Sequence, residues 1–316
     1  MKFKKILNQY RMLLILLFLI ILFGLGNRSF FTVSNFINII RQITVLTIIA
    51  IGMSFVLISG GIDLSVGAQL SFIGVVTATI FTKTSISPLS ACLIGVLIAT
   101  VVGLINGLFI SNTKVPPLIA TLAMQQILIG LGYIISRGRP IYGLDPSVQF
   151  IGQGYVGILP FMTIIMFICI LFGMFMLNKT YIGRSFYVIG NSEEVGRLSG
   201  IKTKTVKTTA FVLCGMLSGI AAIIMMSRIN SGSPTVGRGF EMDVLTAAVL
   251  GGVSVSGGEG KLSGAIAGAL ILGVLSNGLI IMNIGEYYQM VIKGIVLATA
   301  IAFDCVKNVK NLTSAA

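Results

Sequence analysis

The chain has 316 residues, of which 55% are hydrophobic and only 10% are charged, and its formal net charge is +13. A mean hydropathy of +1.02 excludes an ordinary soluble domain and indicates a polytopic helical membrane protein, because apolar runs of about 20 residues recur and each can cross a bilayer. The basic residues are spread through loops rather than gathered in one stripe. The charge therefore does not predict nucleic-acid binding. Basic residues in the loops of a membrane protein are expected from the positive-inside rule.

The residue types that hold metals or form disulfide frameworks are scarce. The chain has no His and four Cys. The cysteines lie in separate apolar segments without CxxC spacing, at Cys92, Cys169, Cys214 and Cys305. They are expected to be small buried hydrophobic residues, and no metal site is predicted.

Apolar runs between polar breaks predict ten membrane spans in one all-α transmembrane domain over residues 1–316. They lie at about 12–27, 42–59, 64–82, 89–110, 118–136, 158–178, 207–228, 240–252, 262–282 and 288–304. The first follows a Lys-rich start and has no clear small-residue cleavage site, so we expect an uncleaved span. The eighth is short.

The basic residues predict the orientation of the spans. With both termini in the cytoplasm, the Lys and Arg residues of the loops divide about two to one in favour of the cytoplasmic side. The loop at about 179–206 is then the most basic one and is cytoplasmic.

A weak internal repeat supports this layout. Three short matches recur in the same order at an offset of about 171 residues: Ser59-Gly60 with Ser231-Gly232, Val66-Gly67 with Val236-Gly237, and Asn106-Gly107-Leu108 with Asn277-Gly278-Leu279. Spans two to five then correspond to spans seven to ten. Because five helices separate equivalent positions, the two units are predicted to be inverted repeats, which are typical of transport proteins.

The polar stretch GNSEEVGRLSGI, at 190–201, predicts a short amphipathic helix. Asn191 is the expected N-cap, with Glu194 completing a capping box, and Gly200 is the expected stop. Val195 and Leu198 share one face. A helix of two turns is unstable alone, so we expect these two side chains to be buried by another protein; the alternative is a linker that lies on the surface.

Two Gly-rich segments, 59–67 and 231–243, predict breaks where helices end or unwind. Such irregular backbone is stable at membrane depth only where it is buried in protein or faces water. Asp63, Glu241 and Asp243 are costly in lipid. They either line a solute pathway or cap the helices that follow them.

The two repeated asparagines, Asn106 and Asn277, either bind a hydroxylated solute or form hydrogen bonds between helices. The second alternative fits the nearby GxxxG pairs, which allow close helix packing: Gly103–Gly107, Gly215–Gly219 and Gly264–Gly268. Tyr288 and Gln289 open the last span as an interfacial belt or as part of the pathway. Lys293 either snorkels or pairs with Glu286.

Two motif matches fail on inspection. Gly260-Lys261 ends like a phosphate-binding loop, but that motif requires Gly at 255 and Ser or Thr at 262, where this chain has Val255 and Leu262. Residues 152–157 spell GxGxxG before a membrane span rather than between a strand and a helix. The chain itself is therefore expected to bind no nucleotide or other cofactor, and no enzyme site is predicted.

Long blocks of the sequence resemble the membrane permease subunits of the ribose, xylose and galactose class of ABC sugar importers, and the ribose-type permeases most. The blocks appear in the family's order between about residues 35 and 304: SGGIDLSVGA (59–68), VPPLIATLAMQQILIGLGY (115–133), YVIGNSEEVGRLSGIK (187–202), GRGFEMDVLTAAVLGGVSVSGGEGKLSGAIAGALILGVLSNGL (237–279) and YYQMVIKGIVL (287–297).

The resemblance implies a homodimeric permease in a bacterial cytoplasmic membrane, with about ten helices per subunit. It implies a cytoplasmic ATPase subunit and an extracytoplasmic solute-binding protein as partners. In that family the loop matching 190–201 contains the coupling helix that docks on the ATPase, and the resemblance carries this role to Asn191, Glu194, Arg197, Leu198, Gly200 and Ile201.

The competing interpretation is a secondary transporter of a small polar solute driven by an ion gradient. Inverted repeats and broken helices permit it. The absence of His and the scarcity of acids within the spans speak against a proton relay.

Overall fold

The computed structural model describes residues 2–113 and 115–313, with side chains placed over 12–113 and 115–305. The described part is almost entirely helical. In chain order it contains α1 (Lys2–Gly26), the 3-10 helix η1 (Arg28–Phe31), α2 (Val33–Ile58), α3 (Val66–Lys83), α4 (Pro88–Thr113), α5 (Pro117–Ser136), α6 (Pro146–Gln153), the strands β1 (Tyr155–Val156) and β2 (Leu159–Pro160), α7 (Phe161–Lys179), α8 (Tyr181–Asn191), α9 (Glu193–Leu198), α10 (Thr203–Ile229), α11 (Phe240–Leu250), α12 (Leu262–Ile281) and α13 (Glu286–Thr313).

The all-helical membrane fold predicted from the sequence is confirmed. Eight described helices are long and apolar enough to cross a membrane, and the apolar stretch Met12–Gly26 of α1 is a shorter one. With the short helix α11, these helices match the ten predicted spans. The largest difference is α2, which begins at Val33 instead of near 42, because Thr32 caps it by accepting a hydrogen bond from Asn35 N and the Asn35 amide donates to Phe30 O.

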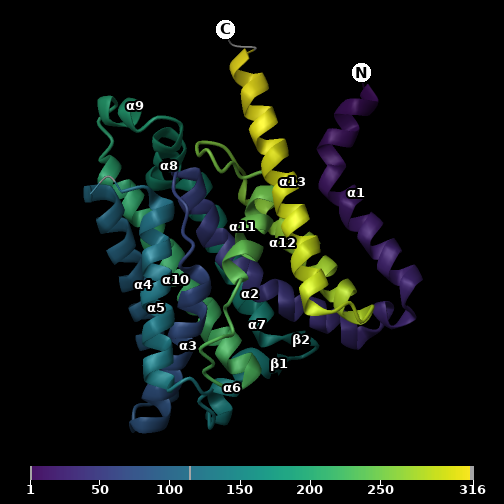
Figure 1. Cartoon of the computed structure of the whole chain (residues 1–316), viewed down its shortest axis with the longest axis vertical. Coiled ribbons are helices and arrows are strands. Elements are labelled where there is room, and N and C mark those ends of the chain that lie inside the picture. The colour runs from purple at the N-terminus through teal and green to yellow at the C-terminus, as the bar shows by residue number, and fades with distance from the viewer. Residues whose placement is uncertain (1, 114, 314–316) are drawn as a thin grey trace.

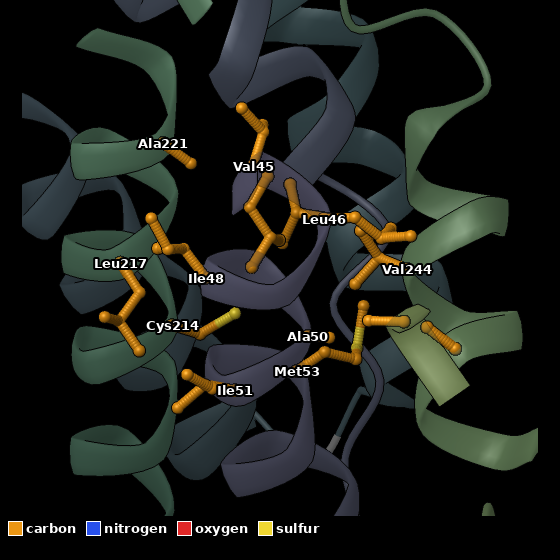
Figure 2. Packing of buried hydrophobic residues seen from close by; sticks show 14 of the residues in the cluster. Val45, Leu46, Ile48, Ala50, Ile51, Met53, Cys214, Leu217, Ala221 and Val244 are labelled. Atoms are coloured by element: carbon orange, nitrogen blue, oxygen red, sulfur yellow. The ribbon is translucent and has the colours of Figure 1, made fainter. Parts of the chain in front are cut away.

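Helix α2 is the centre of the molecule, and every residue from 43 to 58 is buried. Figure 2 shows Ile48 and Ile51 of α2 facing Leu217 and Cys214 of α10. On the other side of α2, Leu46 lies toward Val244 of α11. A helix that is apolar all round suits a position enclosed by other helices.

The packing of the helices follows the predicted inverted repeat. If α2 to α5 correspond to α10 to α13, three pairs of contacts are equivalent: α4 with α10 and α12 with α2, α3 with α5 and α11 with α13, and α3 with α4 and α11 with α12. The contact of α4 with α5 has no such counterpart among the main contacts of the described helices. The C-terminal end of α2 and the N-terminal end of α10 both lie beside α8–α9, as the close approach of Gly60 to Gly190 and the Lys207–Glu193 ion pair show. Equivalent helices therefore run in opposite directions.

The predicted GxxxG positions lie where helix backbones meet. A Cβ on Gly215 would lie 2.5 Å from Ala99 O, and one on Gly103 would collide with Phe211 O, so α4 and α10 touch through backbone atoms. Gly264 and Gly268 of α12 meet the backbone of α11 in the same way. Small residues allow this close packing in a membrane protein.

Figure 1 shows that α1 begins and α13 ends at the same end of the molecule as α9, which an even number of crossings requires. The opposite end carries α6 and the hairpin β1–β2, which the sequence analysis did not predict. Asp145 caps α6 by accepting from Ser147 N at 2.8 Å, and Gly157 provides the left-handed turn of the hairpin at φ 62°.

The backbone contact between α4 and α10 gives a test of the fold. We expect Gly103→Ala to lower the stability of the folded chain by about 1–3 kcal/mol, because the added methyl group overpacks this contact. The measurement is thermal unfolding of the purified chain in detergent.

The matched control is Gly130→Ala in α5, where a Cβ would meet nothing within 4 Å. Its stability should stay equal or rise, since Ala has the higher helix propensity. Equal melting temperatures for the two variants would contradict the packing.

Candidate functional site

The loop between the two repeats folds into two short helices, α8 and α9, rather than the single one that the sequence predicted. Thr180 caps α8 by accepting from Gly183 N at 3.0 Å. Helix α8 is amphipathic and buries Phe186 and Ile189, and Phe186 lies against Phe55 of α2. Helix α8 is thus the rigid support for α9.

The predicted capping box at Asn191 is wrong. Asn191 is the last residue of α8, and the N-cap of α9 is Ser192, whose Oγ accepts from Val195 N at 3.3 Å. Glu194 therefore stands one position earlier in the helix than a capping box requires. Glu193 and Glu194 still place negative charge in the first turn, where the helix dipole favours it.

The predicted stop of this helix is confirmed. Gly200 has φ 78°, a left-handed conformation that is cheap only for glycine. Gly200 N donates to Arg197 O at 3.1 Å, and Ile201 N donates to Gly196 O at 3.0 Å. This pair of bonds is a Schellman motif and satisfies carbonyl groups at the helix end.

Two contacts hold α9 on the body of the protein. Lys207 Nζ of α10 lies 2.8 Å from Glu193 Oε2. The hydrogen bond from Lys207 lowers the pKa of Glu193, against a smaller opposing effect of partial burial, so the Glu193 carboxylate is ionised at neutral pH. On the other side, Gly196 lies against Ile189 of α8. Helix α9 is fixed in orientation although it has only six residues.

The apolar face of α9 points away from the chain. Val195 is 54% exposed and Leu198 is 75% exposed. Arg197 and Gly200 are exposed beside them. The surface is small, apolar and rigidly held, which suits docking into a groove of another protein. That Val195 and Leu198 are buried by a partner remains a prediction.

A second feature, not predicted from the sequence, connects α8 to both repeats. Gly190 lies so close to Ile58 O, at the end of α2, that a Cβ there would collide with the carbonyl. Gly258, in the loop between α11 and α12, donates its N–H to Ile58 O at 2.9 Å, and Tyr187 Oη donates to Gly260 O at 2.9 Å. We call Ile58, Gly190 and Gly258 the three-way junction.

Asp63 and Asn106 are brought together, but in packed protein. Asp63 Oδ1 accepts from Ser65 N at 2.9 Å and from Ser65 Oγ at 2.6 Å. Asn106 Nδ2 donates to Ser65 Oγ at 3.0 Å. All three residues are buried. The cluster fixes the start of α3 against α4. Asn277 in α12, the repeat counterpart of Asn106, is also buried. Its Oδ1 has no hydrogen-bond partner among the described residues.

Asp243 pairs with Lys293 at 2.7 Å and so joins α11 to α13. The predicted alternatives, a snorkelling Lys293 or its pair with Glu286, are wrong. Tyr288 is exposed at the start of α13, and Gln289 Nε2 donates to Ile284 O of the preceding turn at 2.8 Å. The structure therefore does not bring these two residues to the other pathway candidates.

Glu241 is the pathway candidate that lines a hollow. It stands in the first turn of α11, and its Oε1 accepts from Gln125 Nε2 of α5 at 2.9 Å. The hollow is bordered by α3, α5 and residues 234–241 and has a volume of about 180 Å³. The sequence analysis did not single out Gln125, because it lies in an apolar run and no motif around it indicates a site.

Comparisons with known proteins agree with this architecture. Residues 35–301 match the model of a family described as a permease component of branched-chain amino acid transport systems. The chain is 39% identical to the ribose import permease protein RbsC of Bacillus subtilis (strain 168), over 92% of this chain and 90% of that one. It is 38% identical to the L-arabinose transport system permease protein AraH of Escherichia coli (strain K12), over 96% of this chain and 92% of that one. No solved structure matches the chain.

The family match covers most of the chain, and the two relatives align over nearly their whole length. The chain belongs to this family of membrane permeases, and it is similar to ribose and L-arabinose transport permeases over nearly their whole length.

Proposed function

We propose that the chain is the pore-forming subunit of an ATP-driven importer for a monosaccharide such as ribose. The exposed, rigidly held face of α9 is the observation that carries the proposal, because it offers a docking surface at the end of the molecule where both termini lie. The names of the relatives, which import ribose or transport L-arabinose, support the substrate class.

The proposed assembly has three partners. A cytoplasmic ATPase subunit binds α9, a second copy of this chain completes the pore, and an extracytoplasmic solute-binding protein delivers the sugar at the end that carries α6 and β1–β2. Both termini then lie in the cytoplasm of a bacterium, and the chain is not itself an enzyme, since ATP is hydrolysed by the partner. The basic residues beside α9, among them Arg184, Lys202 and Lys204, fit this orientation.

The three-way junction gives the mechanical route. A displacement of α9 by the ATPase moves α8, because Gly196 lies against Ile189 and only one residue separates the two helices. Gly190 of α8 touches Ile58 O, and the same oxygen holds Gly258 N. The displacement of α9 is therefore transmitted to α2 of the first repeat and to the α11–α12 loop of the second. The two repeats then move relative to each other.

Leu198→Asp tests the docking surface. A carboxylate placed in an apolar groove is desolvated without a partner, so we expect the ATPase subunit to be lost from the purified permease and ATP-dependent uptake to fall at least about tenfold. Copurification of the tagged permease and uptake by proteoliposomes are the two measurements.

The control is Ile158→Asp, which makes the same change at an exposed position in the β1–β2 turn at the opposite end. It should retain the ATPase. Full ATPase binding by Leu198→Asp would refute the role of α9.

Gly190→Ala separates docking from transmission. The added methyl group collides with Ile58 O at the junction and leaves the exposed face of α9 unchanged. We expect the ATPase subunit to copurify as with the wild type while uptake drops several-fold. Gly294→Ala in α13, where a Cβ meets nothing within 4 Å, is the matched control. Uptake that is equal in both variants would exclude the junction as the route.

The energy source distinguishes an ABC importer from a secondary transporter. We expect uptake into proteoliposomes of the full complex to require enclosed ATP and to persist when ionophores collapse the proton and sodium gradients. The opposite pattern, uptake that survives without ATP and stops with the ionophores, would assign the chain to secondary transport.

A further inference from the structure

The hollow beside Glu241 has the chemistry of a solute site. Two polar side chains on its wall come from α3 and α5, Ser71 and Gln125, and Gly67 and Gly237 lie close together at its border. Its rim carries the exposed residues Tyr133, Thr235 and Arg238. Its volume of about 180 Å³ is below the range of about 300–1,000 Å³ that holds drug-sized ligands, which suits a small solute.

Glu241 has unused hydrogen-bonding capacity in this hollow. The residue is only 8% exposed, and Oε1 is occupied by Gln125 Nε2. The N–H groups of Gly239 and of Glu241 itself lie near the carboxylate, yet Oε2 makes no hydrogen bond with the described residues. A buried carboxylate oxygen without a partner is costly. Oε2 is buried beside Gly67, and an O–H donor that reached it from the hollow would relieve that cost.

The surrounding groups favour a neutral hydroxylated ligand over an ion. Gln125 and Ser71 are uncharged, and the hydroxyl of Ser71 already accepts from Gly237 N at 2.8 Å, which leaves its own proton to donate. Arg238 at the rim disfavours a cation beside Glu241, and the carboxylate disfavours an anion. Ile129 adds an apolar wall. A sugar presents O–H donors, oxygen acceptors and C–H surface together.

The hollow lies where the two repeats meet. Gly67 and Gly237 are equivalent in the repeat, and a Cβ on either one would collide with the carbonyl oxygen of the other. The turns before them are also alike: Asp63 Oδ1 accepts from Ser65 Oγ, and Ser233 Oγ lies 3.2 Å from Thr235 Oγ1. However, α3 begins at Val66, whereas α11 begins only at Phe240. The stretch that stays unwound in the second repeat forms one wall of the hollow.

We propose that this hollow is a sugar-contact site of the permease, in which Glu241 and Gln125 bind hydroxyl groups of a neutral monosaccharide as it passes between the repeats. The substrate class rests on the function proposed above, whereas occupation of the hollow can be measured on the permease alone. Because bound sugar must be released, the site is expected to be weak, with dissociation constants of about 1 mM or more.

Protection of an introduced cysteine tests occupation. Of the described native cysteines, Cys92, Cys169 and Cys214 are buried and Cys305 is exposed, so Cys305→Ser provides the background. In that background, Thr235→Cys at the rim is labelled with a maleimide on the purified chain in nanodiscs. D-ribose at millimolar concentration should slow the labelling, and neither sodium chloride nor an uncharged non-sugar osmolyte should do so.

The control for this label is Ser85→Cys, which is exposed in the loop between α3 and α4 and does not line the hollow. Its rate should not respond to D-ribose. If D-ribose slows both labels equally or neither, the proposal fails. Protection by sodium chloride without sugar would assign Glu241 to a cation and would also overturn it.

Adjacent glutamines in α5 provide a matched pair of variants for the same protection measurement. Gln125 bonds to Glu241, whereas Gln126 is exposed on the helix surface. Gln125→Leu and the shape-preserving Glu241→Gln should each raise the D-ribose concentration for half-protection about tenfold, since the first removes the amide that bonds to the carboxylate and the second removes its charge. Gln126→Leu should leave it unchanged. Binding of the ATPase subunit reports whether each variant is folded.

The outcomes separate the two proposals. ATP-driven uptake with no protection of Thr235→Cys, and with Gln125→Leu equal to Gln126→Leu, would refute the sugar site and leave the importer intact. Protection that depends on Gln125, in a protein whose uptake does not need ATP, would retain the sugar site and refute the importer.

Discussion

Close contact between helix backbones is the constraint on which the rest of this structure depends. Lipid offers no hydrophobic force to drive two apolar helices together, so packing at small residues must do it. Gly103 and Gly215 bring α4 against α10, and Gly67 and Gly237 bring the two repeats together. The same proximity places Gln125 within hydrogen-bonding distance of Glu241 and lets Gly190 touch the end of α2. The packing of the helices and the geometry of the candidate sites thus depend on the same few positions.

The spans could be predicted because the thickness of the bilayer determines the length of the apolar run that crosses it. The boundary of α2 could not be predicted, since the helix extends through the polar residues before 42, where Asn35 satisfies its amide with Phe30 O. The site was predicted in part. Gly200 marks the end of α9 because glycine adopts its left-handed φ at the lowest cost, whereas Asn191 and Ser192 are both good caps in sequence. Tertiary contact decides between them, because the packing of Gly190 at Ile58 keeps α8 helical through Asn191.

The partner of Lys293 shows a second limit of sequence reasoning. Glu286 lies two turns away on the same helix, a separation of about 10 Å along the axis, which is too long for an ion pair. Asp243 is distant in sequence but adjacent in space, across the contact of α11 with α13. This pair neutralises one of the acids that a proton-driven transporter would need. Among the side chains that the structure describes, the buried acids are Asp63, held by Ser65, and Glu241.

The difference between the repeats explains why the hollow beside Glu241 forms. In the first repeat the carboxylate of Asp63 closes the turn and the helix begins at once, so this region is packed with side chains. In the second repeat Ser233 replaces the acid, and Pro234 and the left-handed Gly239 follow before the helix starts. The missing first turn of α11 leaves room between α3 and α5, and Glu241 occupies its edge. Two identical turns would have given two closed, symmetric contacts. The departure from symmetry leaves this space at the point where the two repeats meet.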